Sequence, residues 1–414
     1  MNDTIKINGG RRLSGEVTIS SCKNSAVAIL PAVVMASEIV KLYDVPSIAD
    51  IDVLIRLLGQ PNIDVRVNED ELTIDPTRIV NADLVNDDVR KLRASYYFMG
   101  ALLGRFRYVR MYAPGGCNLG PRPIDLHLKG FEALGAKIAY DKDVIEISAD
   151  ELIGNDIYLD FASVGATINI MLAACFAKGT TTIENAAKEP EIIDLSSMLN
   201  KMGAKIRGAG TSEIKITGIS RLKGCIHDII PDRIEAGTYI IAAAAMGDNV
   251  MVRNVIPQHI EALTSKLEEM GVKLEIGVDY VRVLSAENLK AVDVITQPFP
   301  GFATDLQQPL TALMCKAKGD SKVEETIYVE RFKHCRELNK MGANIDYHTG
   351  GSVIHGPTAL HGAEVTATDL RCGASLIIAA LMADGQTQIH DAYHIYRGYE
   401  NIADKLKKLG ADIQ

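Results

Sequence analysis

The sequence predicts an α+β fold of two domains, each built from three βαβαββ-type units in an inside-out, barrel-like arrangement. The first observation is a glycine that closes a series of amphipathic segments, at Gly135, Gly203, Gly271, Gly342 and Gly410, with a degenerate copy at Gly59. The second is their spacing of about 69 residues, which divides the 414 residues into six units. A glycine in this place is typical of the end of a helix.

The third observation is an apolar, alanine-rich segment in each unit, such as "GATINIMLAACFAKG" or "AGTYIIAAAAMGDN". A helix that is apolar nearly all round is buried, so we expect helices inside and sheets outside. A short β-type segment such as "TTIEN" follows, then the amphipathic helix, then a β pair such as "NIDYHTGGSVIHG". The alternative is a closed solenoid.

Composition restricts the classes of function. The chain has 44 basic and 53 acidic residues and a net charge of −9, which disfavours a general nucleic-acid binder. The beginning, "MNDTIKINGGRRLSGE", lacks the apolar core of a signal peptide, and no apolar run approaches the roughly 18 residues of a membrane span. The 7 cysteines are irregularly spaced, which favours a reducing cytoplasm, and no Cys/His spacing suggests zinc.

Charged residues gather just before the buried helices of different units. Lys23 with Asn24, then Arg93, Asp305 and Arg371, hold this place. Because equivalent positions of repeats come together in space, basic residues there indicate an anion pocket. Asp305 is either a helix N-cap or a general base.

The segment "YAPGGCNLGPRPIDLH" carries Cys117 after two glycines and Arg122 between prolines. The glycines and prolines predict a loop, so Cys117 is either a surface thiol or a reactive one that closes on a ligand. Cys22 and Cys372 also adjoin a cation, which lowers a thiol pKa. Cys175 and Cys315 lie in apolar segments and predict core packing.

The remaining candidates have ordinary alternatives. Ser163, Val164 and Gly165 precede a buried helix, where free N–H groups hold a phosphate or Ser163 is a plain cap. Asp125 and His127 are either ligand contacts or a first-turn carboxylate and a helix-surface imidazole. The other candidates are ligand contacts or surface ion-pair partners, and this alternative also applies to two of the residues named above: Arg93, Arg331, Asp369, Arg371 and Arg397.

Taken together, these motifs resemble the enolpyruvyltransferases. The resemblance covers the whole chain and rests on the Lys23–Asn24 pair and on "PGGC", "GPRPIDLH", "SVGAT", "EPEI", "PDRIEAGT", "TDLQ", "TDLR" and "RGYE". It implies one domain over residues 22–230 and a second over 1–21 and 231–414, with a hinge near Ser21 and Pro231. It also implies that ligands bind in a cleft that closes.

The resemblance implies transfer of the enolpyruvyl group of phosphoenolpyruvate to the 3′-hydroxyl of UDP-N-acetylglucosamine, the first committed step of peptidoglycan synthesis. Lys23, Arg122 and Arg397 would hold phosphoenolpyruvate, Asp305 would accept the hydroxyl proton, and Cys117 would serve at C3 and form an adduct. Asn24 would contact the amino sugar. The other implied contacts are Arg93, Pro123, Asp125, His127, Ser163, Val164, Gly165, Ile327, Arg331, Asp369 and Arg371. Neither a metal nor a cofactor is expected, and the enzyme would be cytoplasmic.

Some residues depart from the family pattern, with "SSCKNS" for "SGAKNA", "HIYRGYE" for "HLDRGYE" and "TDLQQP" for "TDLQAQ", while the charged groups are intact. Three alternatives remain open: transfer to shikimate 3-phosphate, a non-catalytic paralogue that binds UDP-sugars, and an enzyme acting on nucleic-acid ends.

Overall fold

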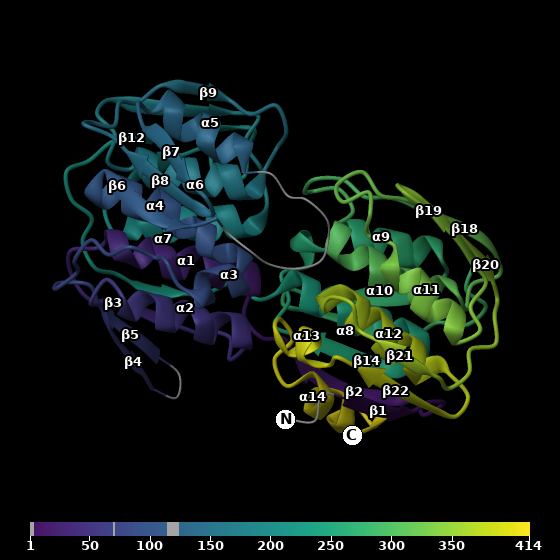
Figure 1. The fold of residues 1–414 in the computed structure, drawn as a ribbon. Helices are drawn as coiled ribbons and strands as arrows, with labels where there is room; N and C mark the ends of the chain where they lie inside the picture. Colours follow the sequence, from purple (N-terminus) through teal and green to yellow (C-terminus); the bar gives the residue numbers. More distant parts are fainter. Residues whose placement is uncertain (1–3, 69–70, 114–123) are drawn as a thin grey trace. The chain divides into compact units, whose positions relative to one another are not determined.

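The computed structural model describes residues 4–68, 71–113 and 124–414, which divide into two compact units. The middle unit comprises the described residues from Ser21 to Ile230. The terminal unit comprises those up to Ser20 and those from Pro231 to Gln414. Each unit has three sheets around its buried helices, and Figure 1 shows both. Cys117, Arg122 and Pro123 lie outside the described residues.

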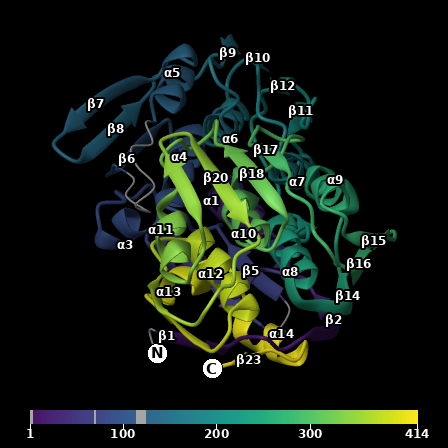
Figure 2. The ribbon, with the colours of Figure 1, turned by 90° about the vertical axis from the view of Figure 1, so that its right-hand side faces the viewer.

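One repeat of the terminal unit shows the βαβαββ order completely. It runs β17 (Asp293–Ile295), α10 (Thr304–Met314), β18 (Gly319–Glu324), α11 (Lys333–Lys340), β19 (Ile345–His348) and β20 (Gly351–Gly356). Strand β17 pairs with β18 in parallel, and β18, β20 and β19 then pair antiparallel. Strands β18 and β20 lie on the outside of α10 and α11 (Figure 1, Figure 2). The predicted order of elements is confirmed.

The rest of the terminal unit forms two further repeats with sheets β15-β16-β14-β2 and β21-β22-β1-β23. Their elements are β1 (Thr4–Asn8), β2 (Leu13–Thr18), α8 (Arg233–Met246), β14 (Gly247–Arg253), η3 (Pro257–His259), α9 (Glu261–Glu269), β15 (Lys273–Ile276), β16 (Tyr280–Ser285), β21 (Glu364–Thr366), α12 (Leu370–Met382), β22 (Gln386–His390), α13 (Tyr393–Tyr396), α14 (Ile402–Lys408) and β23 (Asp412–Ile413).

The middle unit has sheets β13-β3-β5-β4, β6-β8-β7 and β11-β12-β10-β9. Its elements are α1 (Lys23–Ala32), η1 (Val33–Met35), β3 (Val40–Tyr43), α2 (Ala49–Gly59), β4 (Asp64–Val67), β5 (Glu71–Asp75), α3 (Asp87–Lys91), η2 (Arg93–Tyr96), α4 (Tyr97–Phe106), β6 (Tyr108–Tyr112), α5 (Asp125–Ala133), β7 (Lys137–Asp141), β8 (Val144–Ser148), β9 (Asp156–Tyr158), α6 (Val164–Ala174), β10 (Thr180–Glu184), α7 (Pro190–Lys201), β11 (Lys205–Arg207), β12 (Glu213–Thr217) and β13 (Ile226–Asp228).

The chain passes between the units twice. Strand β2 precedes α1 in sequence but pairs with β14 of the terminal unit, whereas β13 precedes α8 but pairs with β3 of the middle unit. Within each unit, a hydrogen bond joins the two chain segments next to the crossing points. In the middle unit the N–H of Cys22 donates to the Ile230 carbonyl at 2.7 Å, and in the terminal unit the N–H of Asp232 donates to the Ser20 carbonyl at 2.9 Å.

The six apolar segments form buried helices, as predicted. In α6 every residue after Val164 is buried, and in α8 every residue from Ile234 to Ala245 is. Alanine has no χ1 rotamer to fix, so these helices lose little side-chain entropy when they pack together. None of the helices in the described part of the chain is long and apolar enough to cross a membrane.

Five of the six repeat glycines end their helices as predicted, with positive φ at Gly135, Gly203, Gly271, Gly342 and Gly410. The sixth expectation is wrong. Gly59 is the last helical residue of α2, and the left-handed residue is Asn62, with φ of 64°. Asparagine tolerates this conformation better than other non-glycine residues, so the left-handed turn of the degenerate copy lies three residues after its helix ends.

Candidate functional site

Asp305 lies in the first turn of α10, between two buried arginines. Its Oδ1 is 2.7 Å from Nη1 of Arg331 and its Oδ2 is 3.1 Å from Nη2 of Arg371. Both arginine side chains are 4% exposed, whereas that of Asp305 is 25% exposed. The expectation that these arginines are surface ion-pair partners is wrong, and the carboxylate is the part of the cluster that a ligand can reach.

Two opposing effects set the ionisation of Asp305. Burial alone would raise the pKa of its carboxyl group, but the positive charges of Arg371 and Arg331 lower it by more and hold it well below its usual range. Working against burial, Asp305 raises the pKa of the Arg331 guanidinium, and Tyr399 together with Asp305 raises that of Arg371. Asp305 is therefore a carboxylate at neutral pH, with both charges beside it fixed in place.

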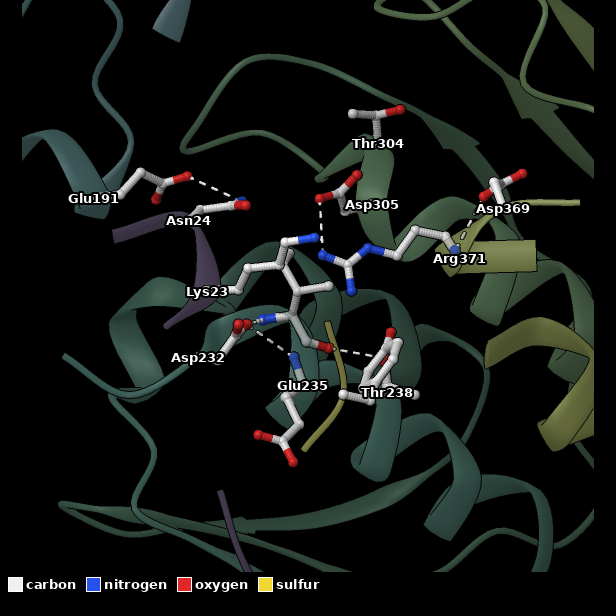
Figure 3. Close-up of polar contacts among 12 residues, drawn as sticks. Lys23, Asn24, Glu191, Asp232, Glu235, Thr238, Thr304, Asp305, Asp369 and Arg371 are labelled. Carbon is white, nitrogen blue, oxygen red and sulfur yellow. Dashed lines mark hydrogen bonds and ion pairs between the residues drawn. The ribbon is translucent and has the colours of Figure 1, made fainter. Parts of the chain in front are cut away.

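A comparison of the three repeats of the terminal unit shows why Asp305 is free for chemistry. Asp232, Asp305 and Asp369 lie at the starts of α8, α10 and α12: Asp232 and Asp369 are N-caps, whereas Asp305 is the second residue of its helix. Asp232 accepts hydrogen bonds from the N–H groups of Ile234 and Glu235, and Asp369 accepts from those of Arg371 and Cys372 (Figure 3).

Asp305 makes no such cap, because the N-cap of α10 is Ala303. The expectation that Asp305 is itself an N-cap is therefore wrong: its carboxylate is turned toward Arg371 instead (Figure 3). A helix without an N-cap side chain is less stable, and such a local loss of stability points to a functional use of the carboxylate.

Glu325, which the sequence did not single out, fixes the backbone around this cluster. Its buried carboxylate accepts hydrogen bonds from the hydroxyls of Thr296 and Thr304, at 2.7 and 2.9 Å. It also accepts from the N–H groups of Ile327 and Tyr328, at 2.9 and 3.0 Å. Glu325 thus ties the start of α10 to the loop that leads to Arg331.

In the middle unit, Lys23 is the first residue of α1 and forms an ion pair with Asp50 at 2.7 Å. A cation at a helix N-terminus opposes the helix dipole, and the Asp50 carboxylate offsets that cost. Asn24 donates a long hydrogen bond of 3.5 Å to Glu191 in the first turn of α7 (Figure 3). The sequence gave no role to Asp50, and Glu191 was visible only as part of the "EPEI" motif.

The start of α6 brings together several of the predicted residues. Ser163 caps the helix by accepting a hydrogen bond from the N–H of Ala166 at 3.3 Å, as the capping alternative predicted. A Cβ atom at Gly165 would lie 2.8 Å from Cε1 of His127 and 2.9 Å from the Tyr96 hydroxyl, so only glycine fits. Asp125 opens α5 as an exposed first-turn carboxylate.

His127 differs from the surface imidazole that was one expectation. It is buried, and its Nδ1 lies 2.8 Å from the side-chain nitrogen of Asn169. Burial, with the nearby charge of Arg93, lowers the pKa of His127 to about 3. The imidazole is therefore neutral at physiological pH.

The remaining candidate residues lie in elements other than those that form the Asp305 cluster. Arg93 is half-buried in η2, with its guanidinium 5.6 Å from the centre of the Tyr96 ring, and Arg397 is half-buried at the end of α13. Val164 opens α6. Among the described residues, no group of three or more His, Cys, Asp or Glu side chains is arranged to hold a metal ion.

The cysteines divide clearly. Cys175 and Cys315 are core residues, as predicted. The expectation of a thiol pKa lowered by a neighbouring cation is wrong for Cys372, because burial raises its pKa to about 12. Successive helix residues do not face one another, so Arg371 directs its charge to Asp305 rather than to the next residue. Cys22 is also buried.

Comparison with known proteins identifies the chain as an enolpyruvyltransferase. A profile of the family described as EPSP synthase (3-phosphoshikimate 1-carboxyvinyltransferase) matches residues 7–406, and the chain belongs to that family. The enolpyruvyl transferase NikO from Streptomyces tendae shares its fold, with a TM-score of 0.91 and 26% identity over 99% of this chain and 98% of that one. EPSP synthase from Acinetobacter baumannii, at 17% identity and a TM-score of 0.76 over 99% of both chains, shows the same fold.

Much closer relatives come from one branch of the family. UDP-N-acetylglucosamine 1-carboxyvinyltransferase 2 from Geobacillus kaustophilus is 55% identical over 99% of this chain and 96% of its own length. The proteins of that name from Listeria monocytogenes serotype 4b and Staphylococcus aureus strain MRSA252 are 53% and 55% identical, over 100% and 99% of this chain and 98% of each relative.

Proposed function

We propose that this enzyme transfers the enolpyruvyl group of phosphoenolpyruvate to the 3′-hydroxyl of UDP-N-acetylglucosamine and releases phosphate. The observation that carries the proposal is the 53–55% identity, over nearly the whole chain, to relatives named for this reaction. The reaction is the first committed step of peptidoglycan synthesis, and we place it in the cytoplasm.

The addition half of the reaction needs a base at the sugar hydroxyl, and we assign Asp305. As the 3′-oxygen bonds to C2 of phosphoenolpyruvate, its proton passes to the carboxylate, while C3 gains a proton on the other side. A carboxylate held by two arginines is a weak base at rest, since its pKa is strongly lowered. Phosphoenolpyruvate carries a phosphate and a carboxylate, and anionic groups beside Arg331 and Arg371 would weaken their hold and make Asp305 more basic.

We assign the binding of phosphoenolpyruvate to Lys23, Arg122 and Arg397. The buried Asp50 carboxylate, 2.7 Å from the Lys23 ammonium group, would keep that cation oriented at the start of α1. Cys117 would serve at C3, form a covalent adduct with phosphoenolpyruvate and assist product release. In the elimination half, C3 loses a proton and the C2–O bond to phosphate breaks, which needs no redox change.

The sugar nucleotide would bind mainly to residues of the middle unit. Asn24 would contact the amino sugar. Ser163 takes the N–H of Ala166, while the N–H groups of Val164 and Gly165 have no carbonyl partner within the helix and suit a diphosphate. We assign to the nucleotide side Arg122, Pro123, Asp125, His127, Ser163, Val164 and Gly165, together with Ile327 of the terminal unit. We expect Arg93, Arg331, Asp369 and Arg371 to surround the substrates as a whole.

A phosphate-release assay with purified enzyme tests the proposal. Phosphoenolpyruvate with UDP-N-acetylglucosamine should release phosphate at a turnover of about 1–10³ s⁻¹, whereas phosphoenolpyruvate with shikimate 3-phosphate should not. Release with shikimate 3-phosphate would place the enzyme in the other branch of the family. Binding of UDP-N-acetylglucosamine without phosphate release would favour a non-catalytic paralogue.

A further inference from the structure

Asn169, a buried residue of α6 to which no role has been given, connects a backbone group of α4 to the imidazole of His127. The N–H of Gly100 donates to Oδ1 of Asn169 at 2.8 Å, and Nδ2 of Asn169 lies 2.8 Å from Nδ1 of His127. Asn169 is fully buried and His127 nearly so. The three groups form a line of hydrogen bonds in the interior of the middle unit.

The direction of these hydrogen bonds follows from the first of them. A backbone N–H can only donate, so the atom of Asn169 that faces Gly100 must be the amide oxygen. The amide nitrogen then faces His127, and because it also can only donate, Nδ1 of His127 must accept. A neutral imidazole with an accepting Nδ1 carries its proton on Nε2.

The close packing of α4 against α6 favours an imidazole whose Nδ1 accepts the hydrogen bond. A Cβ atom at Gly100 would lie 2.3 Å from the carbonyl oxygen of Asn169 and 2.7 Å from its Oδ1, so α4 approaches α6 closely only because residue 100 is glycine. A proton on Nδ1 of His127 would set two donors against each other in a buried site, which costs free energy. Burial also lowers the pKa of His127.

The protonated edge of the ring faces the start of α6. A Cβ atom at Gly165 would lie 3.0 Å from Nε2 of His127, so this nitrogen adjoins the first turn of the helix. The charged and titratable side chains that face His127 come from η2: Arg93, whose charge acts on the imidazole, and Tyr96, whose ring is 4.9 Å away. The side chains that α6 presents there are uncharged.

We propose that Asn169 is a positioning residue that keeps His127 neutral with its proton on Nε2, so that His127 is a fixed hydrogen-bond donor to a diphosphate oxygen beside Gly165. The identity of the acceptor rests on the proposed function. A diphosphate alone would favour a charged imidazole, and the amide of Asn169 opposes this. The nucleotide then binds without proton uptake at His127.

The tautomer can be measured directly in the full-length protein by ¹⁵N NMR of labelled histidine, with His127→Gln identifying the resonances of His127. We expect Nε2 to carry the proton and Nδ1 to carry none from about pH 6 to about pH 8.5, with and without UDP-N-acetylglucosamine. A protonated Nδ1 in either state would overturn the proposal. This measurement does not depend on catalysis, so it separates the proposal from the proposed reaction.

Asn169→Asp keeps the shape of the side chain but replaces the amide group that donates to His127 with a carboxylate oxygen that accepts. One carboxylate oxygen still accepts from Gly100, and the other now accepts from an Nδ1–H of His127, which stabilises the imidazolium. We expect the KM for UDP-N-acetylglucosamine, flat in wild type, to change about tenfold between about pH 6 and pH 8, with kcat nearly unchanged. The NMR signals of His127 should show a proton on Nδ1.

The matched control is Asn200→Asp on α7. Asn200 also bonds through both amide atoms, but to the backbone of Ile206, at 2.9 and 3.0 Å, and not to a histidine. It should lose some stability and leave the pH profile of KM flat. Equal pH profiles for the two variants, or an unchanged His127 spectrum in Asn169→Asp, would overturn the proposal, whereas a wild type without turnover would overturn the reaction instead.

Discussion

Asp305 and Arg331 form a 2.7 Å ion pair between the first turn of α10 and the segment that precedes α11. Arg331 also donates to the hydroxyl of Thr304 at 3.0 Å, and Glu325 accepts from the same hydroxyl. The guanidinium is therefore held at the start of α10 by both Asp305 and Thr304, and Glu325 in turn fixes the Thr304 hydroxyl. The ionisation of Asp305 is set by this fixed charge.

Arg331→Met should make Asp305 easier to protonate. The native pKa of Asp305 is lowered, so its ionisation stabilises the fold above the unfolded pKa, and that stability is lost as the pH falls toward the native pKa. With one guanidinium removed the pKa rises, so the acid limb of the kcat/KM profile and the acid-unfolding midpoint both move to higher pH. Loss of the buried partner should cost up to about 3–5 kcal/mol at neutral pH.

The control for this variant is Arg336→Met, on the exposed face of α11. Urea unfolding should place it within about 0.5 kcal/mol of wild type, with an unchanged pH profile. If both variants shift the acid limb equally, the effect belongs to net charge and not to the Asp305 pair.

Asp305→Asn should lose most turnover while it still binds the sugar nucleotide. The amide keeps the shape of the side chain but cannot accept the hydroxyl proton, and the loss of a general base typically costs about 10²–10⁴-fold in rate. Phosphate release measures turnover, and calorimetry with UDP-N-acetylglucosamine measures binding. Asp404→Asn, at an exposed position of α14, should have normal turnover. Near-normal turnover of Asp305→Asn would show that another group is the base.

The parts of the fold that the sequence predicts are those set by local pattern. The apolar helices and the glycines that end helices can each be predicted from the residues of one element, and their recurrence gives the repeat period. The structure contains all three features. Gly59 misled because its motif matches the others while the chain turns at Asn62 instead. The charged residues at the starts of buried helices were equally visible, and the structure joins two of them, Asp305 and Arg371, while their part in catalysis stays a prediction.

What the sequence could not supply is the identity of partners from distant elements. Asp50 for Lys23, Glu325 for Thr304 and Asn169 for His127 are each joined only by tertiary packing. The burial of His127 has the same cause, since its neighbours Tyr96 and Gly165 come from other segments. Adjacency in sequence also misleads on a helix, as Arg371 and Cys372 show.

The repeat glycines allow a paired stability test. Gly203 has φ of 103° and open space around its Cβ position, so Gly203→Ala suffers only backbone strain and should cost about 1–2 kcal/mol. Gly59 has equally open space but lies within α2, so Gly59→Ala should stabilise by about 0.4–1 kcal/mol. Urea unfolding of both variants measures the difference. Destabilisation by Gly59→Ala would contradict the helical conformation of Gly59.

The last prediction concerns Cys117, the residue that we propose as the reactive cysteine. Cys117 follows two glycines and precedes Arg122, whose charge favours a thiolate. An epoxide phosphonate resembles phosphoenolpyruvate in its phosphorus oxyanion. Attack by the Cys117 sulfur forms a C–S bond, opens the epoxide C–O bond and leaves an alkoxide that takes up a proton.

We expect this reagent to label Cys117, and faster with UDP-N-acetylglucosamine present, as judged by peptide mass spectrometry after brief exposure. Cys372 and Cys22 are internal controls, because both adjoin a cation in sequence but are buried, and burial raises the pKa of Cys372 to about 12. The thiol of Cys372 is therefore protonated at neutral pH and should stay unlabelled. Label on Cys22 or Cys372, or a rate at Cys117 that ignores the sugar nucleotide, would contradict the assignment of Cys117 as the residue that acts at C3.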